Sequence, residues 1–258
     1  MGTISSYPPG GPLDGTEELY AVQSGLSVKI TPENILEYSN NTILRGKITK
    51  VVSGNGGDFP SLNAMLSWIM LTRMIGVDLT VLVEPGTYDI TNTTSNSTLH
   101  LLIGSQLTSL TIRGVNGPTD TIILNSNNSL TSKGFLKIKN MSLTIENLTV
   151  TNSGQDSFLV DATSSSVIMN NVTFNDIGYT LKANSSNVSV TDCTVHYSDV
   201  GIFLENSSTL EINGGILDGG NNVGTKGVDA SSNCTILGRG TFTVKNSNYG
   251  LFLVDGSK

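Results

Sequence analysis

The chain has 258 residues, of which 14% are charged and 6% aromatic, and its formal net charge is −7. This length is sufficient for a large all-β domain with a substantial core. The low pI of about 4.7 and the lack of a Lys/Arg cluster argue against a nucleic-acid-binding surface. The most apolar stretch, residues 62–77, contains Arg73 and is too short to cross a bilayer, so we expect no membrane insertion.

The N-terminal segment lacks the basic region and apolar run of a secretory signal. Asn-x-Ser/Thr triplets nevertheless recur along the chain. Among them are the triplets that begin at Asn92, Asn96, Asn147, Asn171, Asn184, Asn187, Asn206 and Asn233. Without secretion these triplets are not glycosylated, so we expect a structural reason for their number.

The first predicted element is a small β-hairpin near the N-terminus. Residues 18–23 and 26–30 form two short strands joined across Ser24-Gly25. Thr31 is expected to cap a short helix with Pro32 at its first position. We assign residues 1–45 to this module.

The sequence next predicts a linker and an amphipathic capping helix within residues 46–78. Leu62, Met65, Leu66 and Ile69 share one helical face. Asp58 or Ser61 could cap the start of this helix, and Gly76 could mark its end. Such a helix would cover the open end of a following β domain, whose first strand and turn are read in "LTVLVEPGTYDI".

The C-terminal half contains an internal repeat. "SLTIENLTV" from Ser142, "SVIMNNVTF" from Ser166, "NVSVTDCTV" from Asn187 and "TLEINGGIL" from Thr209 align, and a weaker copy follows from Thr235. Each copy is a short alternating strand, a corner and a second apolar piece. The corner column contains Asn147, Asn171, Asp192, Gly214 and, less clearly, Arg239, where the register could slip by one residue. Asn, Asp and Gly adopt left-handed backbone conformations at low cost.

A second column advances together with the corners, at steps of 21–26 residues: Asp161, Lys182, Glu205, Asp229 and Asp255. Two such columns indicate the coils of one parallel β-solenoid, in which identical corners stack about 4.8 Å apart. Asn at the corners and Ser or Thr on the strands then produce the Asn-x-Ser/Thr triplets. We therefore predict an all-β, single-stranded parallel β-helix of about eight coils over residues 79–258. The two cysteines, Cys193 and Cys234, are expected to be buried small hydrophobes, although a disulfide is possible.

"GDFPSL" followed by a helix and "VLVEPGTYDI" resembles the entry to pectin-lyase-like, right-handed parallel β-helices. "PLDGTEELYAVQSGLSVKITPENILEY" resembles the module that opens many phage tail-fibre and tailspike proteins. The resemblance implies a structural virion protein, a tail fibre, tailspike or adaptor, located in the phage particle and assembled in the bacterial host cytoplasm. Residues 1–45 would contact other virion proteins, and the β-helix would form a homotrimer that could recognise host surface polysaccharide. The alternatives are a tailspike depolymerase, acting as a glycoside hydrolase or lyase, and a capsid head fibre or decoration protein.

Residues for pectin-degrading chemistry are scarce. The chain has no Gly-His-Gly, only four arginines, and two histidines; His100 is expected to be a strand residue, and His196 to be outward and solvated. We expect no cofactor and no metal. If the protein is an enzyme, Glu205 and Asp229 on adjacent coils would form the carboxylate pair, about 5 Å apart as in a retaining glycosidase. The same column also resembles an ordinary solvated face, so the sequence leaves enzymatic activity open and favours its absence.

The residues expected to bind glycan are Tyr197, Phe203, Glu205 and Asp229, because aromatic rings beside carboxylates suit sugars. Alternation along the second strand of each coil also predicts an outward apolar stripe, which would make the trimer contact. It contains Leu159, Thr180, Phe203 and Leu253. A register error of one residue would exchange every inward and outward assignment.

Overall fold

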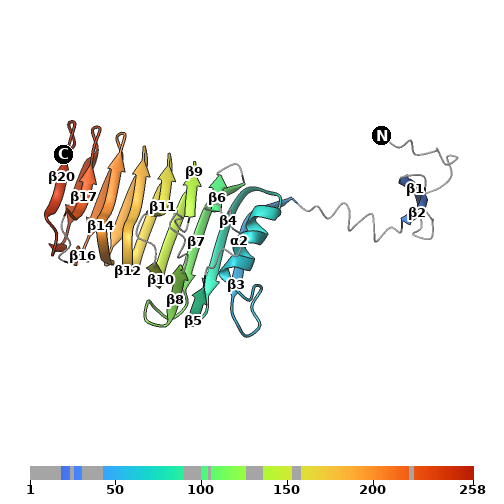
Figure 1. Cartoon of the computed structure of the whole chain (residues 1–258). Helices are drawn as coiled ribbons and strands as arrows, with labels where there is room; N and C mark the ends of the chain where they lie inside the picture. The colour runs from blue at the N-terminus through green and yellow to red at the C-terminus, as the bar shows by residue number, and fades with distance from the viewer. Residues whose placement is uncertain are drawn as a thin grey trace. The chain divides into compact units, whose positions relative to one another are not determined.

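The computed structural model describes residues 19–23, 26–30, 43–89, 100–103, 106–125, 136–152, 158–220 and 224–258 (Figure 1). The chain divides into two compact units, Met1–Leu44 and Arg45–Lys258. Each unit is described by itself below.

The first unit contains the predicted hairpin. Strands β1 (Leu19–Gln23) and β2 (Leu26–Ile30) pair antiparallel, with Leu19 opposite Ile30 and Gln23 opposite Leu26. The hairpin prediction is confirmed. The turn at Ser24-Gly25 and the predicted helix at Thr31 and Pro32 lie outside the described residues.

The second unit begins with β3 (Leu44–Val52) and the helix α2 (Leu62–Leu71). Leu62, Met65, Leu66 and Ile69 are its buried residues, which confirms the predicted face. Ser61 is the N-cap, and its Oγ accepts a hydrogen bond from the backbone N–H of Ala64 at 3.1 Å. Figure 1 shows the helix beside β3 and β4 at one end of the strand stack.

Of the two residues predicted as possible N-caps, Ser61 is confirmed, whereas the predicted end at Gly76 is wrong. Asp58 does not cap the helix but accepts hydrogen bonds from Lys50 and from the backbone N–H of Val51, both at 2.8 Å. The helix ends at Leu71, with Thr72 as its C-cap, and Gly76 lies inside the next strand. The strand begins this early because the side chains of Met74 and Val77 are already buried in the core.

The remaining strands form three faces of one parallel solenoid. The first face contains β4 (Met74–Val83), β7 (Leu107–Gly114), β13 (Asn187–Thr191), β15 (Thr209–Asn213) and β18 (Thr235–Arg239). The second contains β5 (Gly86–Asp89), β8 (Thr121–Asn125), β16 (Ile216–Asp218) and β19 (Thr243–Lys245). The third contains β6 (His100–Ile103), β9 (Leu136–Lys139), β11 (Phe158–Thr163), β17 (Lys226–Ala230) and β20 (Tyr249–Leu253).

Three longer strands run from one face to the next: β10 (Ser142–Asn152), β12 (Ser166–Asn184) and β14 (Thr194–Glu205). All strand pairings within the solenoid are parallel, so the predicted parallel β-helix is confirmed. We call each turn of the solenoid a rung. With the long strands included, each face consists of seven parallel strands, one from each successive rung, in the part of the chain that the structure describes. The first rung starts at Met74, five residues before the predicted start of the coils.

The aligned repeat copies are adjacent rungs of the first face. Ser142, Ser166, Asn187, Thr209 and Thr235 pair in that order, as the alignment predicts. Alternation places every second residue inward, where like residues stack into columns that exclude water. One such column is buried throughout and consists of Leu79, Leu110, Leu143, Val167, Val188 and Leu210.

The corner after the first face has a left-handed backbone. Asn147, Asn171, Asp192 and Gly214 have φ values of 56°, 51°, 50° and 75°. Asn171 Nδ2 donates to Asn147 Oδ1 at 2.9 Å, so the amides bond up the stack. In the next rung Arg239 pairs with Asn213, and Gly240, at φ 64°, takes the corner, so the register slips by one residue there.

A second corner follows the third face and explains another group of Asn-x-Ser triplets. The left-handed positions include Asn140, Ser164, Ser185, Asn206, Ser207, Ser232 and Asn233. The serine that follows this corner is buried and accepts a backbone hydrogen bond from the rung before. Ser186 Oγ accepts from the N–H of Ser165, and Ser208 Oγ from the N–H of Ser186, both at 3.1 Å. Asn184 and Asn206 therefore precede Ser186 and Ser208 for structural reasons.

Both cysteines are buried and free, as expected for small core residues. Burial raises the pKa of the Cys193 thiol to about 11. This thiol therefore stays protonated and unreactive at neutral pH.

Replacing Asn171 with alanine should destabilise the protein by about 1–2 kcal/mol. Alanine is strained in the left-handed backbone conformation, and it cannot form the side-chain hydrogen bond to Asn147. Asn171→Gly should cost less, because glycine adopts this backbone freely. Urea unfolding measures both. The neighbouring Asn170→Ala is the control, and an equal loss at Asn170 and Asn171 would contradict the role of the corner.

Candidate functional site

The outward side chains of the third face form a column of charged and aromatic residues. Strand pairing places Asp161 beside Lys182, Lys182 beside Phe203, Phe203 beside Asp229, and Asp229 beside Phe252. Lys137 precedes Asp161. Aromatic rings thus flank a carboxylate on consecutive rungs, about 4.8 Å apart.

The predicted carboxylate pair does not occupy equivalent positions. Asp229 is level with Phe203, whereas Glu205 is level with Asn184 and lies two residues further along its strand. The prediction failed because successive rungs differ in their number of residues. Spacing along the sequence therefore aligned Glu205 with Lys182 and Asp229, whereas the residue of β14 at that position is Phe203. The expectation of an adjacent-coil pair at Glu205 and Asp229 is therefore wrong.

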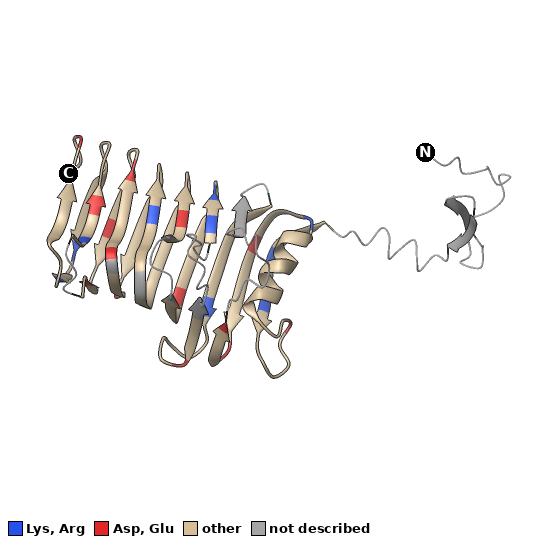
Figure 2. Cartoon of the chain, in the orientation of Figure 1, with Lys and Arg blue, Asp and Glu red and all other residues tan. Residues whose placement is uncertain are grey.

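Each carboxylate of this face is held by a lysine. Lys137 Nζ lies 3.2 Å from Asp161 Oδ2, Lys182 Nζ lies 2.9 Å from Glu205 Oε1, and Lys226 Nζ lies 2.6 Å from Asp229 Oδ2. Figure 2 shows the two charges alternating between neighbouring strands of this face, from β9 to β12. Opposite charges on adjacent rungs neutralise one another at a distance of one strand spacing.

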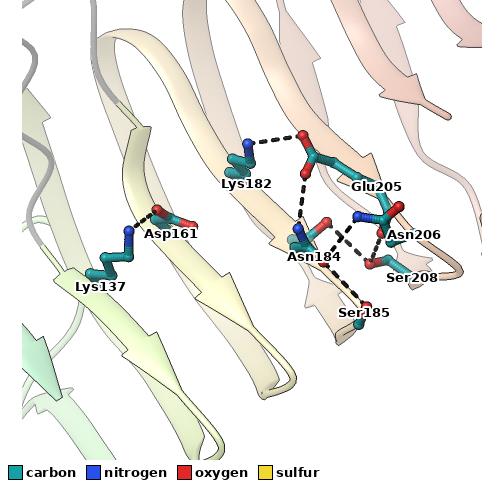
Figure 3. Close-up of polar contacts among 9 residues, drawn as sticks. Lys137, Asp161, Lys182, Asn184, Ser185, Glu205, Asn206 and Ser208 are labelled. Carbon is teal, nitrogen blue, oxygen red and sulfur yellow. Dashed lines mark hydrogen bonds and ion pairs between the residues drawn. The ribbon is translucent and has the colours of Figure 1, made fainter. Parts of the chain in front are cut away.

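Glu205 also belongs to the polar network of the second corner. Asn184 Nδ2 donates to Glu205 Oε2 at 3.1 Å, and Asn206 Nδ2 donates to Asn184 Oδ1 at 3.2 Å. Figure 3 shows these contacts together with the Lys137–Asp161 and Lys182–Glu205 pairs. Both oxygens of Glu205 are therefore engaged within the protein.

The aromatic residues of the third face contact the same lysines. Lys182 Nζ lies 5.5 Å from the centre of the Phe203 ring, and Lys226 Nζ lies 3.9 Å from the centre of the Phe252 ring. Tyr249 packs edge-on against Phe252, with ring centres 5.4 Å apart, and is half exposed. The sequence analysis missed Lys226, Tyr249 and Phe252. Aligning Phe252 with Phe203 would have found them.

Tyr197, predicted to stack on a sugar, is a core residue with 3% exposure. Its hydroxyl group is hydrogen-bonded to Ser247, and its ring packs over Gly201. A Cβ on Gly201 would lie 3.2 Å from this ring and 2.6 Å from the backbone oxygen of Gly227. The tyrosine fits inside because glycines occupy this bend, so its prediction as a glycan contact is wrong.

The predicted interface stripe is not continuous on the surface. Leu159 and Thr180 are 0% and 1% exposed, and their neighbours Val160 and Leu181 are also buried. Two successive residues point inward because the strand bends between the second and third faces, where the pairing of β12 with β14 shifts register. Leu253 pairs with Ala230, in an inward column, and is 43% exposed on the last rung. Phe203 remains outward.

The second face carries a well-organised carboxylate that the sequence analysis did not select. Asp218 Oδ1 accepts hydrogen bonds from Asn246 Nδ2 at 2.8 Å and from the N–H of Gly220 at 3.2 Å. Lys245 Nζ lies 3.2 Å and His196 Nδ1 3.5 Å from its Oδ2. The Asn246 hydrogen bond is the main cause that lowers the pKa of Asp218 to about 2, opposed by burial and supported by Gly220 and Lys245. One carboxylate thus ties three successive rungs together.

Comparison with family models matches residues 108–258 to the right-handed β-helix region. The chain belongs to the right-handed β-helix family. The match covers more than half of the chain and agrees with the parallel rungs of the solenoid. Searches of curated proteins and of solved structures found no match to this β-helix.

Within the part of the β-helix chain that the structure describes, no helix is long and apolar enough to cross a membrane. The described residues also contain no group of three or more His, Cys, Asp or Glu side chains that could hold a metal ion.

Thr180→Val should raise the free energy of unfolding of the β-helix by about 1 kcal/mol. Thr180 Oγ1 is buried without a hydrogen-bond partner among the described residues, so a methyl group of similar size removes an unmet polar group. Thermal or urea unfolding tests this, with the outward Thr173→Val as the control. A clear loss of stability in Thr180→Val would show that the hydroxyl has a partner.

Asp218→Asn should lower the stability of the β-helix by about 1–2 kcal/mol at pH 7. Because the folded pKa lies below the usual 3.8, the wild-type carboxylate stabilises above about pH 4 and loses this contribution as the pH falls towards 2. The difference between the two proteins should therefore shrink as the pH falls from about 4 to 2 and vanish below about pH 2. Urea unfolding at several pH values measures this, and a pH-independent difference would contradict the charge-based cause.

Proposed function

We propose that this β-helix is a non-enzymatic binding protein of a phage virion, of the tail-fibre or tailspike type, and that its third face recognises host surface glycan. The observation that carries the proposal is the column Phe203–Asp229–Phe252 on consecutive rungs. Rings that are partly exposed offer apolar surface to the C–H groups of a sugar. The lysines and carboxylates beside them offer hydrogen-bond donors and acceptors to hydroxyl groups.

Several contacts favour binding over cleavage at this face. A retaining glycosidase needs two carboxyl groups about 5–5.5 Å apart, one of them protonated to act as an acid. Glu205 and Asp229 are at different positions along their strands, and each is paired with a lysine.

The virion assignment rests on the N-terminal module. Residues 1–45 resemble the opening module of phage fibres, and the chain divides into separate compact units at residues 44 and 45. We propose that this module attaches the protein to other virion proteins and that the chain assembles as a homotrimer. The trimer is proposed from the resemblance alone, because Leu159 and Thr180, two of the four residues expected to form its contact, are buried.

Glycan binding can be tested with the full chain on host cells and on purified host polysaccharide. Phe252→Leu keeps apolar volume but removes the ring, and should weaken binding about 3- to 10-fold. Leu237→Ala, on the first face of the same rung, is the control and should bind as the wild type. Equal binding by wild type and Phe252→Leu would exclude the third face.

The virion role requires the protein to be present in assembled particles. Mass spectrometry of gradient-purified particles from a phage that encodes this chain should detect it at a fixed copy number. Deleting residues 1–44 should remove it from the particles. Normal incorporation of the deleted form would contradict the attachment role of the module.

A further inference from the structure

We infer that the third face selects uncharged glycans, whose vicinal hydroxyl groups bind the lysine–carboxylate pairs; this rests on the proposed function. The pairs Lys182–Glu205 and Lys226–Asp229 flank the two phenylalanine rings. Their four formal charges sum to zero. We call the two rings and the two ion pairs together the aromatic patch. This patch has no net charge with which to attract an acidic polymer.

The geometry of each pair suits a diol. A lysine ammonium group only donates hydrogen bonds and an ionised carboxylate only accepts them. At Nζ–O distances of 2.9 Å and 2.6 Å the two groups are neighbours, as are two adjacent hydroxyl groups of a pyranose ring. Each oxygen of an ionised carboxylate can accept two hydrogen bonds, so one hydroxyl can donate to a carboxylate oxygen that already accepts from the protein while the next hydroxyl accepts from the lysine, and the ion pair stays intact.

The net charge of the whole protein also disfavours the binding of acidic glycans. With a formal net charge of −7, the protein repels a polyanion at low ionic strength. A uronate or phosphate group placed on the patch would also displace a lysine from its carboxylate and leave a carboxylate unpaired. That exchange is unfavourable because the residue left unpaired would be largely buried: Asp229 is only 8% exposed.

Binding can be measured by biolayer interferometry with a panel of bacterial surface polysaccharides of known composition, some neutral and others rich in uronate or phosphate. We expect the full chain to bind neutral members, with an affinity that changes less than about twofold between 50 and 500 mM NaCl, because no net charge is screened. Binding confined to acidic members, or a steep loss with salt, would overturn the inference and leave the proposed function standing. No binding to any member would overturn both.

A charge variant sharpens the test. Asp229→Asn gives the patch a net charge of +1 and should add salt-sensitive binding to acidic members while weakening binding to neutral ones several-fold. Asp161→Asn changes the charge of the protein equally but lies away from the phenylalanine rings, so it is the matched control. If both variants gain acidic binding to the same extent, net charge and not the patch sets selectivity, and the inference fails. Urea unfolding verifies that both variants are folded.

Discussion

Parallel stacking of backbone rungs at one fixed spacing is the constraint on which this structure depends. Each residue of a rung lies directly over its counterpart in the rung before, so favourable and unfavourable contacts are both repeated. Apolar side chains stack on apolar ones in the core, and left-handed corners stack on left-handed corners. Asn171, stacked over Asn147, has two roles: it adopts the left-handed backbone conformation of the corner, and its side chain donates a hydrogen bond to Asn147.

Features that depend on local conformation could be read directly from the sequence. The buried face of α2 follows from helical spacing, and the first corner follows from the preference of Asn, Asp and Gly for positive φ. The repeat alignment also gave the register of the first face, because the residues that follow Ser142, Ser166 and Asn187 pair one to one in the same alternating pattern. These features require no knowledge of how distant faces pack.

The third face could not be read in the same way. Its register depends on how many residues each rung uses to pass the bend, and alternation is lost where Leu159 and Val160 are both buried. A one- or two-residue difference there moved Glu205 away from Asp229 and sent Tyr197 into the core. The ion pairs could not be predicted from the sequence either, because they follow no single spacing. Lys226 pairs with Asp229 of its own strand, whereas Lys182 pairs with Glu205 of the next strand.

The buried Tyr197 has a consequence for how the solenoid opens. In a stacked array each rung normally contacts only its immediate neighbours, so the last rungs can fray one at a time. The Tyr197 side chain starts on β14 and is hydrogen-bonded to Ser247, which follows β19 two rungs away. This bond skips the intervening rung, so the last rung cannot detach without freeing a tyrosine hydroxyl in the core. Backbone amides of β14, β16 and β19 should accordingly exchange with solvent as one cooperative block, not as a gradient towards the end.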